Sequence, residues 1–285
     1  MLTSGGQKEG LSRAVVFRWL ALLLVVCGAI SAFFPFFWMA VTSLKTAPEI
    51  QRVPLQVFPD SWTNWQNYRE VFTRHPFARY LLNSALIAST AAISSLVISS
   101  LAGYGFAKFR FPGRDFFFFG IIGILMVPFQ SVVVPLYGWV SRLGLLDTYL
   151  GIVAPDLVSV FGIFLMRQAI EVLPNDYMDA ARIDGCNKFQ VYWHVAMPLA
   201  KPAIGVLAVF NALAVWNEYL LAMLVLSDRS LMPLQRGLMV FEGAHITEYP
   251  LLMAGIAISI VPIVTLYFMM QRYIVAGITA GALKM

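Results

Sequence analysis

Six long apolar stretches constrain this chain more than any other feature of its sequence. Each has about the length, roughly 20 residues, that a helix needs to cross the hydrocarbon core of a bilayer. Lipid offers no hydrogen-bond partner to an unpaired backbone group, so stretches of this kind must be helical. The sequence therefore predicts an all-α membrane protein with six transmembrane helices, at residues 15–41, 80–106, 116–140, 149–166, 203–226 and 251–270.

The composition agrees with a single transmembrane domain that covers residues 1–285. Hydrophobic residues make up 59% of the chain and charged residues only 12%, against about 25% charged residues in an average soluble domain. Pro128 and Pro135 in the third stretch and Pro262 in the sixth predict kinks in those helices. The first stretch is interpreted as a retained helix and not as a cleaved signal peptide, because no small-residue cleavage site follows it.

The distribution of Lys and Arg predicts the orientation. If the N-terminus is inside, twelve of the 20 Lys and Arg residues fall on the inner side and eight on the outer side. This bias favours a multi-pass protein of the inner (plasma) membrane of a prokaryote with both termini in the cytoplasm. The net charge of +5 gives no reason to expect nucleic acid as a partner. Cys27 and Cys186 fall at different depths, so neither a disulfide nor a metal site is expected.

The inner segment at residues 170–202 is polar and carries helix signals of its own. Asn175 and Asp176 are N-cap candidates, and Gly185 suits the left-handed conformation that ends a helix. A helix of about ten residues is marginal on its own in water, so packing must order it. The residues alone leave two interpretations open, namely a docking element for a partner protein and a helix that lies on the bilayer surface.

Three motifs in this segment are similar to a known loop pattern: Asp179-Ala180-Ala181, then Asp184-Gly185, then Val195-Ala-Met-Pro198. The chain resembles the inner-membrane permease subunits of ATP-binding cassette (ABC) importers, and the resemblance covers nearly its whole length. It implies the type I ABC importer permease fold, with a cytoplasmic coupling helix between transmembrane helices four and five. The coupling helix of this family inserts into a cleft of the cytosolic ATPase.

The resemblance implies coupling roles for Asp179, Ala180, Ala181, Asp184, Gly185 and Pro198. The chain departs from the usual pattern in having Asp179 where Glu is common and Met197 where Leu is common. Asp keeps the charge but has a shorter reach, so Asp179 is the position where the usual contact is most in doubt.

Two further stretches resemble the carbohydrate-uptake branch of the family, in particular the second permease subunit of maltose-type importers. One is Val215-Trp-Asn-Glu-Tyr-Leu220, and the other is the closing run from Gln271 to Lys284. In that branch the tail contacts the ATPase, which makes Gly277, Thr279 and Gly281 candidate contacts. The alternative for the tail is a frayed terminus.

Trp216, Asn217, Glu218 and Tyr219 are a candidate solute path inside the fifth helix. Glu218 is the only acidic residue well inside an expected span, and a charge at that depth needs water or a partner. The amide of Asn217 and the carboxyl group of Glu218 suit hydrogen bonds to a polyol, and the rings of Trp216 and Tyr219 suit stacking on it. The competing interpretation is a structural anchor between helices. Asp156 carries the same pair of alternatives, with a helix N-cap as its structural role.

The chain is not expected to be an enzyme. It contains no phosphate-binding loop and no recurring catalytic constellation, so no catalytic and no metal-binding residue is assigned. By resemblance, ATP and Mg²⁺ are bound by a partner ATPase and this chain binds no cofactor. The implied partners are a second permease subunit, two ATPase subunits and an extracytoplasmic solute-binding protein, besides membrane lipid.

The implied function is ATP-driven alternating access for sugars or oligosaccharides. An importer of a polyol phosphate or another non-sugar solute is the alternative within the family. An ion-driven secondary transporter is the alternative outside it, although such folds usually show paired repeats and buried midplane charges.

Overall fold

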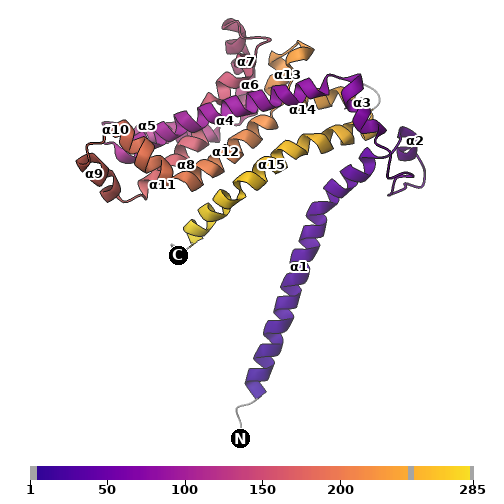
Figure 1. Ribbon diagram of the computed structural model, residues 1–285, viewed down its shortest axis with the longest axis horizontal. Helices are drawn as coiled ribbons and strands as arrows, with labels where there is room; N and C mark the ends of the chain where they lie inside the picture. Colours follow the sequence, from indigo (N-terminus) through magenta and orange to yellow (C-terminus); the bar gives the residue numbers. More distant parts are fainter. Residues whose placement is uncertain (1–4, 243–246, 283–285) are drawn as a thin grey trace. The chain divides into compact units, whose positions relative to one another are not determined.

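A computed structural model describes residues 5–242 and 247–282, with side chains described for 16–242 and 247–271. Within these ranges all regular secondary structure is helical (Figure 1). Four helices are long and apolar enough to cross a membrane, and two sharply bent helix pairs raise the number to six if each pair is one span. The chain divides into a smaller unit, residues 1–71 and 244–258, and a larger unit, residues 72–243 and 259–285.

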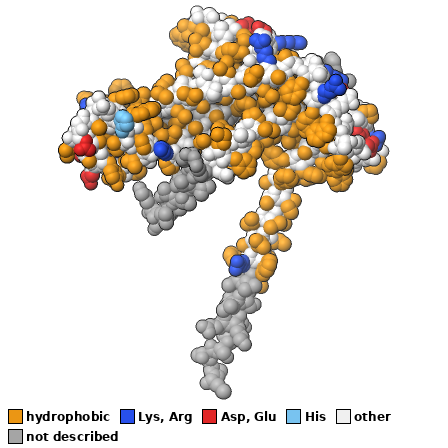
Figure 2. Space-filling view, viewed as in Figure 1, with side chains coloured by type: hydrophobic (Ala, Val, Ile, Leu, Met, Phe, Trp, Pro, Cys, Tyr) orange, Lys and Arg blue, Asp and Glu red, His pale blue; other side chains and the backbone are white. Residues whose placement is uncertain are grey.

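The smaller unit contains α1 (Gly5–Ser43), whose candidate span is Val16–Ser43. In the most apolar window of that span no residue is buried within the structure. Hydrophobic side chains accordingly cover the visible surface of α1, and they also cover much of the larger unit (Figure 2). Apolar surface of this extent is what lipid or another membrane helix would contact.

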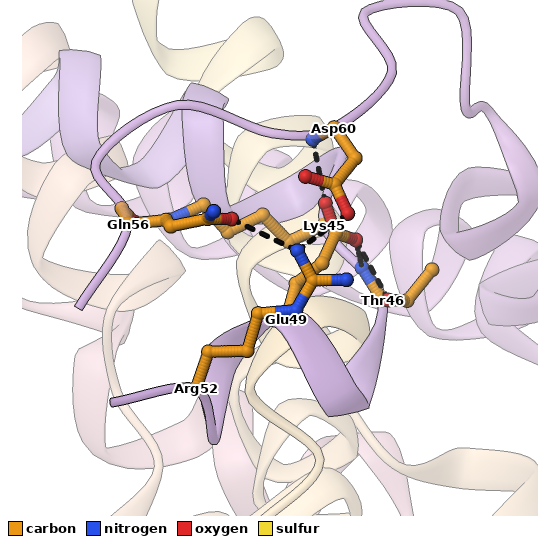
Figure 3. Close-up of polar contacts among 6 residues, drawn as sticks. All are labelled: Lys45, Thr46, Glu49, Arg52, Gln56 and Asp60. Atoms are coloured by element: carbon orange, nitrogen blue, oxygen red, sulfur yellow. Dashed lines mark hydrogen bonds and ion pairs between the residues drawn. The ribbon is translucent and has the colours of Figure 1, made fainter. Parts of the chain in front are cut away.

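A compact polar network follows α1 and holds the short helix α2 (Ala47–Ile50) (Figure 3). The Glu49 side chain, only 4% exposed, accepts a hydrogen bond from the backbone N–H of Asp60 at 2.6 Å. It also accepts from the Thr46 backbone N–H at 2.5 Å and the Thr46 hydroxyl at 2.7 Å. Arg52 pairs with the Asp60 carboxylate at 2.7 Å. One buried carboxylate thus ties residues 46 and 60 together.

The residues before α2 are fixed by a buried lysine and a buried asparagine. The Lys45 ammonium group donates to the backbone carbonyl of Gln56 (Figure 3) and lies 5.2 Å from the centre of the Trp38 ring. Asn67, on α3 (Gln66–Arg74), donates to the carbonyls of Ser43 at 2.7 Å and Lys45 at 2.8 Å. Hydrogen bonds from these two side chains to backbone carbonyls therefore hold the end of α1 to the segment that follows it.

In the larger unit, the sequence-predicted third span is broken. It consists of α5 (Arg114–Gly123), which continues as η1 (Ile124–Met126), and of α6 (Phe129–Arg142). The two halves meet at 102° around Pro128, because proline lacks an N–H and disfavours helix in the residue before it. The kink expected at Pro128 is thus a complete break, whereas Pro135 lies inside α6.

The fourth and fifth spans are also interrupted. The fourth consists of α7 (Tyr149–Val153), η2 (Ala154–Leu157) and α8 (Val160–Glu171). In the fifth, where the sequence predicted one helix, three residues separate the end of α12 (Lys201–Trp216) from the start of α13 (Leu220–Val225). After η4 (Arg229–Leu231), α14 (Leu234–Leu238) and η5 (Met239–Glu242), the last helix that the structure describes is α15 (Tyr249–Ala282), which contains Pro262.

Helix α4 (Phe77–Lys108) is the central element of the larger unit and packs on α8 and α12 (Figure 1). Small buried side chains, Ser95, Ser99 and Gly103, permit the close approach. A methyl group placed on Gly103 would lie 2.7 Å from Cβ of Met166 on α8. These small residues therefore form the face of α4 that packs closely on its neighbours.

The two ends of α4 hold two different loops. At its C-terminal end, the Lys108 ammonium donates to the carbonyl of Leu173 at 2.8 Å. Near its N-terminal end, the Asn83 amide donates to the carbonyls of Ser230 at 3.0 Å and Met232 at 2.9 Å. With a rise of 1.5 Å per residue, Asn83 and Lys108 are about 38 Å apart. The segment after α8 and the segment after α13 thus lie at opposite ends of the larger unit.

Candidate coupling surface and solute path

The predicted coupling helix is α9 (Asn175–Ile183). It begins one residue earlier than the capping signals suggested, because Pro174 occupies the N-cap position and no side chain caps the helix. The expectation that Asn175 or Asp176 is the N-cap is therefore wrong. Asn175 instead accepts a hydrogen bond from the Lys108 ammonium at 2.9 Å. This contact fixes the start of α9 to the end of α4.

The C-terminus of α9 is closed by a Schellman motif around Gly185. The N–H of Cys186 donates to the carbonyl of Ala181 at 2.9 Å, and the N–H of Gly185 donates to the carbonyl of Arg182 at 3.0 Å. Gly185 has φ of +87°, in the left-handed region that favours glycine. The helix stop predicted from Gly185 is confirmed, and the chain leaves α9 in a sharply defined direction.

The two faces of α9 have different environments. Met178 is 2% exposed and packs into a cluster beneath the helix, and Ala181 is half-buried against the same cluster. On the outer face Ala180 and Asp184 are exposed, and the apolar side chain of Ile183 is 86% exposed. A fully exposed isoleucine beside small residues is a surface that a partner protein would cover.

Asp179 has a partner within α9. Its carboxylate accepts from the Arg182 guanidinium at 2.8 Å, and both side chains are about half exposed. Exposed pairs of this kind contribute on the order of 0.5 kcal/mol, so Asp179 remains free to exchange partners. Pro198 is also exposed and lies in α11 (Met197–Leu199), two residues before the 81° bend at Ala200 that leads into α12.

The cluster beneath α9 connects the loop to three long helices. It is formed by Met178 on α9, Val191 and Tyr192 in the return segment, and residues of α4, α8 and α12, among them Tyr104, Met166, Ile170 and Leu207. The return segment runs through α10 (Lys188–Val191) and a π-helical turn, Tyr192–Ala196. The hydroxyls of Tyr192 and Ser100 are 2.7 Å apart. A push on α9 would therefore reach α4, α8 and α12 through packed side chains.

The candidate solute path lies at the break in the fifth span, at the other end of the larger unit. Glu218 accepts a hydrogen bond from the Leu221 N–H at 2.9 Å and so caps the start of α13. Trp216 is 7% exposed and lines an apolar cavity of about 510 Å³ between α4, α12 and α15. Asn217 and Tyr219 are exposed. The four residues do not face one site.

Asn217 and Tyr219 each lie beside side chains of the segment that follows α13. The Gln235 amide donates to the side-chain oxygen of Asn217 at 3.2 Å and holds α14 beside the break. Tyr219 lines a cavity of about 310 Å³ together with Arg229 and Arg236. In the sequence, this site is marked only by two arginines in the segment after α13. Their position beside Tyr219 depends on the fold, because α14 and the break bring them there.

Asp156 does not have the N-cap role considered for it. It lies in η2, and Ser159 caps α8 by accepting from the Gly162 N–H at 2.9 Å. Asp156 lies at the break in the fourth span, and Glu218 lies at the break in the fifth.

The candidate tail contacts Gly277, Thr279 and Gly281 lie in the last part of α15. The structure describes the helical backbone of this part, while the side chains lie outside the described residues. The contact of the tail with an ATPase stays a prediction from the resemblance.

Comparison with known proteins places this geometry in a family. Residues 78–280 match the family described as "Binding-protein-dependent transport system inner membrane component". The chain is 32% identical to the arabinooligosaccharides transport system permease protein AraQ of Halalkalibacterium halodurans, over 94% of this chain and 97% of that protein. It is 30% identical to the sn-glycerol-3-phosphate transport system permease protein UgpE of Pectobacterium atrosepticum, over 90% and 94% of the two chains.

A solved structure is also similar. It is a crystal structure of a bacterial ABC transporter involved in the import of the acidic polysaccharide alginate, with a TM-score of 0.79 and 25% identity over 96% of this chain and 99% of that chain. The all-helical architecture is thus the type I ABC importer permease fold. The alternative of an ion-driven secondary transporter does not agree with these matches. The chain belongs to the family of binding-protein-dependent transport system inner membrane components, as a multi-pass permease subunit of an ABC importer.

Proposed function

We propose that this chain forms one half of the translocation path of a sugar or oligosaccharide importer and transmits ATP-driven motion through α9. The observation that carries the proposal is the construction of α9. It is held to α4 through Lys108, its Met178 packs into the buried cluster that also contains residues of α4, α8 and α12, and Ile183 is exposed on its outer face. The relative that handles arabinooligosaccharides supports the solute class.

We infer the partners from the family to which the chain belongs. Six helices enclose too little space for a path, so a second permease subunit completes it. Two ATPase subunits bind ATP and Mg²⁺ and receive α9 of this chain and the equivalent helix of the other permease, while this chain itself binds no cofactor. A solute-binding protein docks at the end of the larger unit that carries α13 and α14. In this arrangement both termini face the cytoplasm, as the Lys and Arg bias favours.

The cycle is a rigid-body exchange between two states. Closure of the ATPase dimer draws the two coupling helices together, and the cluster beneath α9 passes the movement to α4, α8 and α12. The path then opens toward the docked binding protein and takes up the solute. ATP hydrolysis separates the ATPase subunits and returns the path to its inward-facing state.

A polyol phosphate is the second candidate solute. The UgpE relative, for sn-glycerol-3-phosphate transport, is nearly as similar as the AraQ relative.

Cysteine cross-linking tests the assignment of α9. In a chain whose Cys27 and Cys186 are replaced by serine, Ile183→Cys is treated in assembled membranes with a reagent that carries a maleimide at one end and an amine-reactive ester at the other, so that the new thiol can be joined to a lysine of a neighbouring protein. The expected product joins this chain to its co-expressed ATPase subunit. Arg142→Cys, exposed at the end of α6, is the matched control and should give no such product. If no cross-linked product forms and the introduced cysteine on α9 reacts only with a membrane-soluble reagent, α9 is instead a helix that lies on the bilayer.

A further inference from the structure

We propose that the loop between α2 and α3, residues 51–65, inserts its apolar side chains into the bilayer surface at the C-terminal end of α1. The loop belongs to the smaller unit, together with α1, and connects its two helices by turns. Its partner is lipid, at the depth where headgroups meet acyl chains. The coupling surface and the candidate solute path both lie in the larger unit, so this proposal is independent of them.

The first argument is the exposed apolar surface of the loop. Five large apolar side chains are each more than half exposed, namely Val53, Leu55, Phe58, Trp62 and Trp65. Single apolar residues on a protein surface need no explanation, but five in one short loop mark a surface that a partner covers. Tryptophan is moreover enriched where a membrane meets water.

The second argument is the depth of the loop. It folds back along the last turns of α1 (Figure 1), where the ring of Phe58 lies 6.4 Å from the ring of Phe37. The ring of Trp62 in turn lies 6.0 Å from that of Phe58. Phe37 precedes Ser43, the last residue of α1, by six residues, so this contact is about 9 Å below the end of the helix. The apolar side chains of the loop therefore lie beside the span and not beyond it.

The length of α1 shows which layer of the membrane this is. Its candidate span, Val16–Ser43, has 28 residues and is about 42 Å long, whereas the hydrocarbon core is only about 30 Å thick and the headgroup regions bring the total to about 40–45 Å. Arg18 is the only charged residue in the span, so a core of about 20 residues counted from Trp19 ends at Trp38. Phe37 and the loop packed on it thus lie at the boundary between acyl chains and headgroups. The backbone of an irregular loop can be hydrated there, which hydrocarbon would not permit.

The third argument is that the loop brings no unpaired charge to this boundary. Arg52 and Asp60 form an ion pair at 2.7 Å, and the buried Lys45 ammonium donates to the carbonyl of Gln56. The fourth charge between residues 45 and 65 is the buried carboxylate of Glu49, which accepts three hydrogen bonds. Two positive and two negative charges cancel, so apolar area and not headgroup charge drives the insertion.

Spin labelling of the full-length chain, in its assembled complex in proteoliposomes, measures the depth of the loop. In a chain whose Cys27 and Cys186 are replaced by serine, a nitroxide is attached to Leu55→Cys or to Trp62→Cys. Its collisions with oxygen, which concentrates in lipid, are compared with its collisions with a water-soluble nickel chelate. We expect both labels to favour oxygen and to lie about 5–10 Å inside the headgroup boundary, as interfacial apolar side chains do.

Two further positions calibrate the scale. Leu24→Cys, exposed in the middle of the α1 span, is the reference for hydrocarbon. Arg69→Cys, exposed on α3, is the control on the water side and should favour nickel.

A matched pair of substitutions tests the cause. With the label at position 62, Leu55→Asp should raise the collisions with nickel several-fold, because a charge resists transfer out of water, whereas Leu55→Ile should change nothing. The yield of assembled complex shows that each variant is folded. The collision ratios of the parent loop should be equal in phosphatidylcholine and phosphatidylglycerol vesicles, because the loop has no net charge.

Three results would overturn the proposal. Labels at positions 55 and 62 that favour nickel, like the label at position 69, would place the loop in water. Immobilised labels that meet neither reagent would show that a protein, the second permease or the solute-binding protein, covers the loop. Insertion confined to phosphatidylglycerol vesicles would contradict apolar area as its cause. Each of these leaves the coupling role of α9 untouched, which the Ile183→Cys cross-link tests separately.

Discussion

Gly103 shows how a single residue sets the distance between two helices. A Cβ at this position would lie 2.7 Å from Cβ of Met166 and 2.8 Å from the backbone nitrogen of Arg167. Both neighbouring atoms are held by helix α8, so they cannot swing aside. We predict that Gly103→Ala destabilises the protein by about 1–3 kcal/mol, the usual range for overpacking in a close-packed core.

Gly105, two residues along the same helix, is the matched control. A Cβ there would meet nothing within 4 Å. Gly105→Ala should leave stability unchanged or raise it by about 0.5–1 kcal/mol, because alanine loses less backbone entropy in a helix than glycine does. Thermal unfolding in detergent measures both variants, and equal stability of the two would contradict the close approach of α4 and α8.

At this scale, much of the packing could be predicted from the sequence, but the break in the fifth span could not. Serines and glycines in an apolar helix indicate close packing by their size alone. Residues 217–219 contain neither proline nor glycine, so no local signal separates α12 from α13. The break is held by a cap from Glu218 and by Gln235, which is 18 residues from Asn217 in the sequence. Those contacts exist only in the folded chain.

Among the elements, α2 with its network depends on the charge of Glu49. Burial by itself raises the pKa of this carboxyl group, but hydrogen bonds from Asp60 and Thr46 and the charge of Arg52 outweigh burial and hold the pKa below its ordinary value of 4.5. A carboxyl group with a lowered pKa contributes stability that is complete above the ordinary value and is lost as pH falls through the folded-state pKa.

We therefore predict that amide-exchange protection of residues 44–65 is constant near neutral pH and falls below about pH 4.5. Glu49→Gln should lower this protection already at pH 7, by about 1–3 kcal/mol, because three charge-assisted hydrogen bonds become weaker. It should also flatten the acid dependence. Glu70→Gln, on α3, serves as the control. An unchanged acid dependence in Glu49→Gln would show that another group titrates.

The existence and the end of α9 were predictable, while its beginning and its faces were not. Gly185 ends the helix by local backbone geometry, which the sequence carries directly. The start follows Pro174, which occupies the N-cap position, and is held to α4 by Lys108, which lies 67 residues before Asn175. Similarly, Met178 is buried in a cluster that α4, α8 and α12 help to form. Contacts with side chains that are distant in the sequence leave no local signature.

For the whole molecule, the main result is the separation of two surfaces along α4. The candidate coupling surface around Ile183 lies beyond its C-terminal end, and the cavity beside Tyr219 adjoins the loop held by Asn83, about 38 Å away by the rise of the helix. The six apolar stretches predicted this class of protein. The pairing of Arg229 and Arg236 with Tyr219 required the fold, because it depends on how α13 and α14 return beside the break.

The most direct test of the coupling role is ATP hydrolysis by the reconstituted complex with and without its loaded binding protein. Ile183→Asp places a charge on the exposed outer face of α9 and leaves the buried face intact, so the complex should form normally but lose most of the stimulation. Ile183→Leu, which keeps the apolar surface, should retain it. Full stimulation in Ile183→Asp, at an unchanged level of assembled complex, would contradict transmission through α9.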